Sequence, residues 1–367
     1  MVLSTALVIL LLTCTGLALP VASIGSRSGC FRRVPFETAF AYLSIATLYV
    51  FLCLHSNDFG TDGPAYLRVL QAYCEKQYNL FNLKSSWYFD LSILYFATFG
   101  TCSAAIFPLA WATVVLAVLL AIDAKWTDKA YFISALLLSI VGIECLTNAL
   151  RQGISTALLI LSVSYYPRRK WVCLTAGVAC IFAHESAVLM LAALCLCMLP
   201  IRLYVISMSV LIVWVLTSLS SNVELASLQQ VPGIGSFFYE LSKYMSHDPV
   251  EFWVRALALT TVLSTCATAL VVTFVAKGAG SQRDSQNVKQ LLSLKLALCC
   301  IPLSFVPYFG YRFAYGIYPL ILWFSLFSVP MHKRRTAYAM IVGANIVVLF
   351  LWALGSSRMS SQLFFSI

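Results

Sequence analysis

The stretch "NALRQGISTALLILSVSYYPRRK" (148–170) places an arginine inside a long apolar tract, and it decides how the chain folds. Arg151 lies about one helical turn after the start of the quoted stretch. An arginine at membrane depth costs about 2.5–3.5 kcal/mol on insertion scales. The apolar tract 130–166 has 37 residues. One helix of that length would measure about 55 Å, whereas the hydrocarbon core of a bilayer is about 30 Å thick. The tract must therefore turn, and polar "NALRQG" (148–153) is where it can.

The composition of the whole chain is not that of a soluble globular protein. Of its 367 residues, 61% are hydrophobic and only 10% are charged. Apolar runs of about 18–25 residues recur along it, which predicts an all-α polytopic integral membrane protein with about twelve transmembrane helices (about eleven to thirteen). No internal repeat or long polar segment interrupts the pattern. We therefore expect residues 1–367 to form one transmembrane domain.

The net charge of +10 is carried by short basic clusters at 27–33, 167–170, 277–289 and 332–335. Clusters of this size between apolar runs fix membrane orientation by the positive-inside rule, so no nucleic-acid partner is expected. The N-terminus lacks the basic start of a cleaved signal, and its positive charges come after the apolar run. We interpret it as a retained first span with its N-terminus outside.

The apolar runs define the expected spans. They are 3–24, 36–54, 91–121, 130–147, 149–166, 171–183, 186–200, 203–220, 253–276, 291–306, 315–330 and 336–354. The stretch 171–199 is long for one span and short for two. An unbroken span would put the last two basic clusters outside, whereas a break at "AHES" (183–186) puts every basic cluster inside.

We therefore expect a recessed break at 183–186, which is tolerated only beside protein or a water-filled cavity. This topology leaves two large outer loops, 55–90 and 221–252. It also leaves a short outer turn, "PYFGYRFAYGIYP" (307–319).

Four groups of polar side chains gather on the outer side of this topology. They are Asp58, Asp62, Tyr66 and Arg68; Asn148, Arg151 and Gln152; His184 and Glu185; and Tyr308, Tyr311, Arg312 and Tyr315. In the second group the spacing of Asn148, Arg151, Gln152 and Ser155 makes one helical stripe. Arg151 can then face an outward-open polar cavity rather than lipid.

Each group also has a purely structural interpretation. Arg151 could extend to the membrane interface, and His184 could be a hydrogen-bonded packing residue. The tract 307–319 could be an aromatic interfacial belt, and "GTDGP" (60–64) is first of all a turn. Four segments that converge on one face nevertheless favour a functional site.

The thirteen cysteines lie mostly inside apolar runs, where cysteine behaves as a small hydrophobic residue. Their spacing does not resemble that of a zinc site. We expect neither a metal site nor a cofactor.

At these polar groups the sequence resembles the EpsG/Wzy-type bacterial polysaccharide polymerases. The motifs that carry the resemblance are "DGPAY" (62–66), "NALRQG" (148–153), "HESA" (184–187) and "RFAYGIYP" (312–319). They occur in the order typical of that family, over about residues 36–330. Glu185 departs from the pattern, which has a lysine or a variable residue there.

The resemblance implies a glycosyltransferase of the bacterial inner (cytoplasmic) membrane, with an architecture related to C-type glycosyltransferases. Such an enzyme polymerises oligosaccharide repeat units carried on undecaprenyl diphosphate at the periplasmic face, as in O-antigen and lipopolysaccharide synthesis. It transfers the growing glycan to a sugar hydroxyl of the next lipid-linked unit. A chain-length regulator is an implied partner.

The residue types suit that chemistry. Arg151 and Arg312 could bind the diphosphate, since arginine offers bidentate donors and a fixed charge. Asn148, Gln152, Tyr66, Arg68, Tyr311 and Tyr315 are the further substrate-binding candidates. His184 is the natural base for the acceptor hydroxyl, with Glu185 or Asp62 as substitutes.

Two other classes remain open. A glycosyltransferase that uses a polyprenyl-monophosphate sugar would use an outer-loop aspartate as its base, with or without a divalent metal, and Asp58 and Asp62 permit this. A lipid-linked oligosaccharide flippase also has about twelve spans and cationic cavity residues. The long outer loops, the missing repeat symmetry and the gathering of polar residues at one face argue against a flippase.

Overall fold

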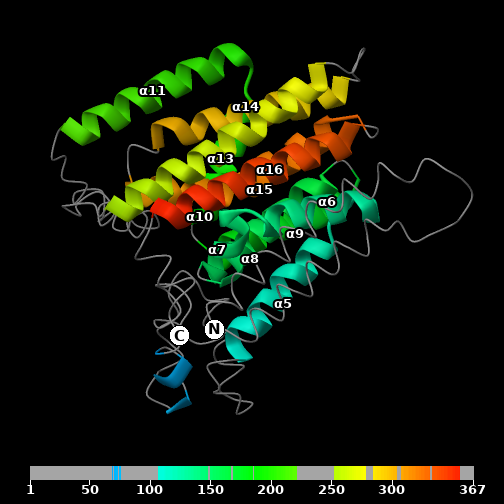
Figure 1. Ribbon diagram of the computed structural model, residues 1–367, viewed down its shortest axis with the longest axis vertical. Coiled ribbons are helices and arrows are strands. Elements are labelled where there is room, and N and C mark those ends of the chain that lie inside the picture. Colours follow the sequence, from blue (N-terminus) through cyan, green and yellow to red (C-terminus); the bar gives the residue numbers. More distant parts are fainter. Residues whose placement is uncertain are drawn as a thin grey trace, which may run out of the picture.

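The structure is a computed structural model, and it describes residues 106–147, 149–166, 168–184, 186–220, 252–277, 284–303, 307–330 and 333–355, with parts of 68–75. Within these ranges every regular element is a helix (Figure 1). The long helices are α5 (Ile106–Leu120), α6 (Trp126–Leu137), α7 (Ile140–Thr147), α8 (Leu150–Tyr165), α9 (Lys170–Ala183), α10 (Ser186–Met198), α11 (Ile201–Ser220), α13 (Phe252–Lys277), α14 (Asp284–Leu303), α15 (Pro307–Ser328) and α16 (Arg334–Gly355).

The all-α prediction is confirmed for this part of the chain. Helices α8, α9, α10, α11, α13 and α16 begin and end within two residues of the expected spans. The expected spans 3–24 and 36–54 and the loop 221–252 lie outside the described residues, as does most of the loop 55–90. Within the described ranges, no helix combines the length and apolar composition needed to cross a membrane. The polytopic topology therefore stays a prediction.

Three expected boundaries are wrong. The span expected at 291–306 is α14, which runs from Asp284 to Leu303 and takes in part of the basic cluster 277–289. The run 130–147 is two helices, because Ser139 breaks it and caps α7: its Oγ accepts a hydrogen bond from the Gly142 amide at 3.0 Å. The outer turn expected at 307–319 is instead the first half of α15. Pro307 occupies the first helical position, where a missing N–H costs nothing, so the proline starts this helix instead of preventing it.

The turn expected within "NALRQG" is confirmed. Helix α7 ends at Thr147 and α8 begins at Leu150. The turn is tight because Gly153 lets the first turn of α8 lie against the backbone carbonyl of Cys145 in α7, at a position that a Cβ would occupy. A glycine is therefore required at this point of the motif.

The break expected near His184 is also confirmed. His184 is the C-cap of α9 and has extended backbone angles, φ −159° and ψ 131°. Helix α10 starts two residues later, at Ser186.

Helix α15 lies at the centre of the packing. Its residues from Phe313 to Leu326 are buried almost without interruption, and it contacts α13, α14, α8 and α10. Figure 1 shows α13, α14, α15 and α16 running roughly alongside one another, with α7, α8 and α9 below them. Asn345 of α16 joins this core through its side chain: Oδ1 accepts from Tyr318 and Ser264, each at 2.9 Å.

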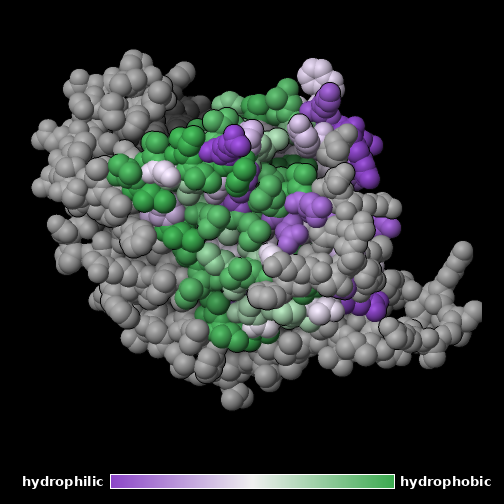
Figure 2. All heavy atoms as spheres, turned by 90° about the horizontal axis from the view of Figure 1, so that it is seen from above, coloured by the Kyte–Doolittle hydropathy of each residue, from purple (hydrophilic) through white to green (hydrophobic). Residues whose placement is uncertain are grey.

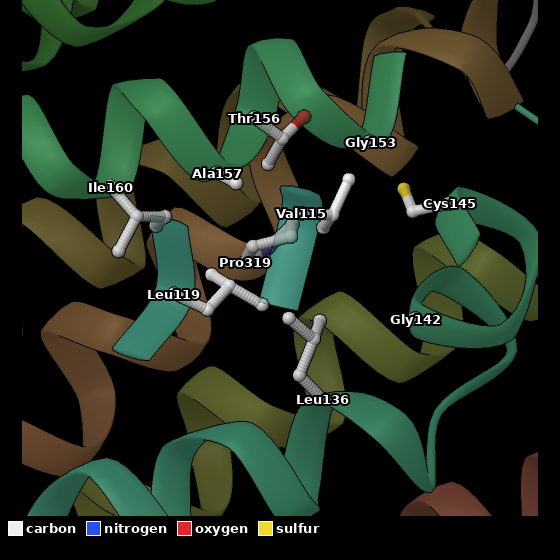
Figure 3. Close-up of a pocket in the computed structure, with 10 residues that line it drawn as sticks. All are labelled: Val115, Leu119, Leu136, Gly142, Cys145, Gly153, Thr156, Ala157, Ile160 and Pro319. Atoms are coloured by element: carbon white, nitrogen blue, oxygen red, sulfur yellow. The ribbon is translucent and has the colours of Figure 1, made fainter. Parts of the chain in front are cut away.

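A small cavity of about 20 Å³ lies where α5, α6, α7, α8 and α15 meet (Figure 3). Its lining is Val115, Leu119, Leu136, Gly142, Cys145, Gly153, Thr156, Ala157, Ile160 and Pro319. The cavity has room for no more than a single water molecule and is almost wholly apolar. It is a packing gap between helices, too small for a sugar.

Candidate functional site

The antiparallel pair α8–α9 fixes the position of two predicted site residues. Ser155 Oγ donates to the carbonyl of Cys180 at 2.8 Å, and Ser162 Oγ donates to the carbonyl of Cys173 at 2.7 Å. Both bonds belong to one antiparallel register, in which moving one residue towards the C-terminus on α8 corresponds to moving one residue towards the N-terminus on α9. Continuing that register by four residues sets Arg151 opposite His184, so the two share one end of the helix pair.

The start of α8 is fixed from a second side by α5. The indole Nε1 of Trp111 donates to the carbonyl of Leu150 at 2.6 Å in a buried contact. Leu150 precedes Arg151, so this bond orients the first turn of the helix that carries the arginine. The Arg151 residue is partly exposed, whereas Gln152 beside it is only 3% exposed.

His184 also fixes the start of α10. Its Nδ1 accepts a hydrogen bond from the backbone amide of Ser186 at 3.0 Å. A nitrogen that accepts from an amide carries no proton, so the neutral ring has its proton on Nε2. In that tautomer Nε2–H is a donor, able to bind a phosphate or hydroxyl oxygen but unable to take up a proton.

Helix α15 also begins at this end of the bundle, as its contacts with α14 and α10 indicate. Lys295 of α14 bonds the end of α10, and Ser293 of α14 lies 2.6 Å from Ser325 near the end of α15. Lys295 bonds the Leu199 carbonyl, whereas Cys299, further along α14, lies 3.8 Å from Cys197, earlier on α10, so α10 and α14 are antiparallel. Only three residues separate α14 from α15, which therefore turns back along α14, so α10 and α15 are parallel to each other. Gly316 of α15 packs against the Met190 side chain of α10.

This parallel register can be followed towards the helix starts. One turn before Met190 on α10 is Ser186, and one turn before Gly316 on α15 is Arg312. The backbone of Arg312 is thus level with the start of α10. Arg151, His184 and the Arg312 backbone come from three separate segments of the chain and lie at one end of the bundle.

The other predicted site residues are distributed as follows. Asp58, Asp62, Tyr66, Asn148 and Glu185 lie outside the described residues, and of Tyr308, Tyr311 and Arg312 only the helical backbone is described. Arg68 is exposed. Tyr315 is 1% exposed and belongs to the core, which does not favour the predicted contact with a sugar.

The arrangement suits an anionic ligand. Helices α8 and α10 begin at this end, and the first turns of α-helices carry a partial positive charge. The first two amides of α10, at Ser186 and Ala187, already donate to the ring and the carbonyl of His184. Arg151 adds a full positive charge at the start of α8. The combination of helix starts and guanidinium is what a phosphate or diphosphate group requires.

Three residues that position this site were not singled out from the sequence: Trp111, Met190 and Gly316. Trp111 orients α8, and Met190 with Gly316 sets the level of α15 against α10. A glycine inside the aromatic run "FAYGIYP" (313–319) was the available signal for a close helix–helix approach. Nothing in the sequence pattern marks Trp111 as a partner of Leu150.

No group of three or more His, Cys, Asp or Glu side chains that could hold a metal ion occurs among the described residues. Of the side chains that the structure describes, the site just built contains one histidine, His184, and one arginine, Arg151.

The described part of the chain is an all-helical bundle with Arg151 at the start of α8 and His184 just before the start of α10. The particular family follows from comparison: the model of the EpsG family matches residues 38–365, and the chain belongs to that family. Membership associates it with polysaccharide polymerisation, a glycosyltransferase-type activity. No curated protein and no solved structure matches the chain.

Proposed function

We propose that this protein polymerises oligosaccharide repeat units carried on undecaprenyl diphosphate, at the periplasmic face of the bacterial inner membrane. The growing glycan is transferred from its lipid diphosphate to a sugar hydroxyl of the next lipid-linked unit. The observation that carries the proposal is the shared level of Arg151, His184 and the Arg312 backbone at the starts of α8 and α10.

In the proposed reaction the acceptor hydroxyl oxygen attacks the anomeric carbon of the donor. The bond from that carbon to the diphosphate oxygen breaks, and its electron pair leaves with the diphosphate. The charge that develops on the leaving group is stabilised by Arg151, by Arg312 and by the partial positive charge at the starts of α8 and α10. Preorganised donors of this kind typically contribute about 10²–10³ in rate.

The proposal gives His184 the role of a donor. Its Nε2–H binds a diphosphate oxygen or a sugar oxygen, because Nδ1 is occupied by the Ser186 amide. The proton of the acceptor hydroxyl then passes to another group. Glu185 and Asp62 are the candidates for that base.

The bilayer location is supported by the surface of the described helices. Large apolar side chains are exposed along α9 at Trp171, Leu174, Val178 and Phe182, where Trp171 is 79% exposed, and along α11 at Ile206, Val210 and Val213. Figure 2 views the molecule from the side on which α11 lies at the top of Figure 1, and it shows hydrophobic atoms spread over that face, with most hydrophilic atoms towards the right. Such a surface suits contact with lipid.

A second observation supports the orientation. Cys74, in the proposed outer loop 55–90, is disulfide-bonded. Disulfides persist in oxidising compartments such as the bacterial periplasm and are rare in the cytosol. A periplasmic position for this loop is consistent with an active site at that face, and with a chain-length regulator as a periplasmic partner.

The glycan profile of a deletion strain tests the proposal. Loss of a polymerase leaves single repeat units on the final carrier, because export and ligation still proceed. A strain with no surface glycan at all would instead identify a flippase or a ligase. A purified reaction that stops when a chelator is added would favour the metal-dependent, monophosphate-using glycosyltransferase.

A further inference from the structure

Three sulfur atoms from three helices meet at the end of α10 that lies away from His184. The Sγ of Cys299 in α14 lies 3.8 Å from the Sγ of Cys197 in α10, and 3.6 Å from the Sδ of Met208 in α11. All three side chains are buried, with exposures of 2%, 1% and 8% for Cys299, Cys197 and Met208. The proposed glycan chemistry uses none of them.

A buried positive charge lies beside these sulfur atoms. Lys295 is 4% exposed, and its Nζ donates to the carbonyls of Cys197 at 3.0 Å and Leu199 at 2.6 Å. In the part of the chain that the structure describes, no carboxylate forms an ion pair with it. A buried ammonium without a negative partner is costly, so the surroundings of Lys295 favour an added negative charge.

We propose that Cys197, Cys299 and Met208 form a binding site for one soft monovalent metal ion, of which Cu(I) is the biological example. Thiolate and thioether sulfur select Cu(I) over harder ions. On binding, each of the two thiols exchanges its S–H bond for an S–Cu bond, and the two protons leave to water. No oxidation state changes.

The charge balance favours a monovalent ion. Two thiolates and one Cu(I) carry one net negative charge, which the ammonium of Lys295 neutralises. A divalent ion with the same ligands would be neutral and would leave Lys295 uncompensated. Zn(II) also prefers four protein ligands in a closed site, more than this cluster supplies.

The sulfur spacing fits the proposed geometry. A metal–thiolate bond of about 2.3 Å places sulfurs about 4.0 Å apart in a trigonal plane. Two of the three separations, Cys197–Cys299 at 3.8 Å and Cys299–Met208 at 3.6 Å, need to open only slightly. Tyr204 of α11 helps to hold the helices together, since its hydroxyl donates to the Lys295 carbonyl at 2.7 Å and lies 3.7 Å from the Cys299 Sγ.

The test is a titration of the full-length, detergent-purified chain with Cu(I) under reducing, oxygen-free conditions. A chromophoric Cu(I) chelator competes for the ion, and X-ray absorption reports its ligands. We expect one tightly held Cu(I) with sulfur-only coordination. Lys295→Met removes a group beside the ligands, and it should lower the Cu(I) affinity by about 10–100-fold, as is typical of such losses. Cys197→Ser or Cys299→Ser removes a ligand itself and should lower the affinity further.

Cys195→Ser is the matched control, because Cys195 lies on the same helix but is exposed. It should bind Cu(I) like the native chain. Met208→Leu conserves side-chain volume and should fold normally, so it reports on the site even if the cysteine variants do not fold. The site is disproved if the native chain binds Cu(I) no more tightly than Met208→Leu and Lys295→Met.

Discussion

Arg151 and His184 lie opposite each other at one end of the α8–α9 pair, four residues beyond the hydrogen bond from Ser155 to the Cys180 carbonyl. One residue supplies a permanent positive charge and the other a neutral N–H donor beside the start of α10. A diphosphate held between them would be contacted by both. The functional consequences of this pairing can be separated by substitution.

Arg151→Ala should reduce polymerisation by about 10²–10³ while the protein still inserts and folds, because it removes a preorganised donor for the leaving group. Arg151→Lys should restore part of the loss, since lysine keeps the charge but cannot form two parallel hydrogen bonds. Arg312→Ala and Arg312→Lys should behave in the same way. Glycan length in complemented deletion strains measures the effect, and native-length glycan from both alanine variants would remove the arginines from the site.

Two substitutions at His184 distinguish a donor from a base. His184→Gln keeps an N–H at the reach of Nε2, so a donor role predicts nearly native polymerisation. His184→Asn places its amide near Nδ1, where it can still cap α10 but cannot reach the substrate. Loss of a hydrogen bond to a charged group costs about 1.5–3 kcal/mol, which is about 10- to 150-fold in rate.

A general base at His184 predicts a different pattern. Both amide variants would then lose about 10²–10⁴ in rate, and the native enzyme would lose activity below the imidazole pKa. Initial rates with lipid-linked substrate, measured across pH, separate these outcomes. Near-native rates for His184→Gln together with a loss for His184→Asn are what we expect.

Much of the fold could be predicted from the apolar runs. Helix α8 is a clear case: its apolar residues end at "PRRK" and begin after a polar turn, and both boundaries agree with the structure. The first half of α15 could not be predicted in this way. Gly310, Gly316, Pro307 and Pro319 favour a turn locally, whereas packing against α13 and α14 favours a helix.

The sequence predicted the site as a set of residues on one face of the protein. The register between helices that brings these residues together is known only from the structure. The sequence alone cannot say that Ser155 bonds Cys180, because many helix-pair registers suit the same polar pattern. The hydrogen bond from Ser186 to Nδ1 decides which ring nitrogen of His184 carries the proton in the neutral ring, and a sequence carries no sign of it.

Two Asp–Arg pairs at the other end of the bundle should differ strongly in what they contribute to stability. Asp128 pairs with Arg334 at 2.7 Å, with side-chain exposures of 8% and 17%. Asp128→Asn should destabilise the fold by about 3 kcal/mol, since it leaves the mostly buried Arg334 guanidinium without a carboxylate, with the Val329 carbonyl as its remaining hydrogen-bond acceptor. Asp123→Asn is the control: its partner Arg168 is 72% exposed, so the loss should be about 0–1 kcal/mol. Thermal unfolding in detergent measures both, and equal midpoints would contradict the expectation.

The predicted topology specifies on which side of the membrane three positions of the chain lie. Reporter tags fused at Lys170 and at Lys289 should give a cytoplasmic signal, because both residues end basic clusters and the positive-inside rule retains such clusters. A tag within 221–252 should give a periplasmic signal. A cytoplasmic signal from 221–252 would overturn the orientation, and with it a periplasmic active site.

The contact between Gly316 and Met190 should control the level of Arg312 against α10. A Cβ at Gly316 would overlap the Met190 side chain, so Gly316→Ala must push the methionine aside or move α15 relative to α10. Met190 is fully buried, so its side chain has little room to yield, and we expect α15 to shift and to carry Arg312, one turn away, from the start of α10. Polymerisation should therefore fall by more than the loss of stability explains, because a displacement of about 1 Å can cost about 10²-fold in a positioned reaction.

Met190→Ala supplies the matching test, since it empties the space that the added methyl group needs. On its own it should be destabilising by about 2–5 kcal/mol, the usual cost of truncating a buried methionine. Combined with Gly316→Ala it should recover polymerisation relative to Gly316→Ala alone, although the double variant remains less stable than the native protein. Glycan length and thermal midpoint, measured on all four proteins, give the coupling between the two positions. Additive effects on both quantities would mean that the α10–α15 contact does not position the arginine.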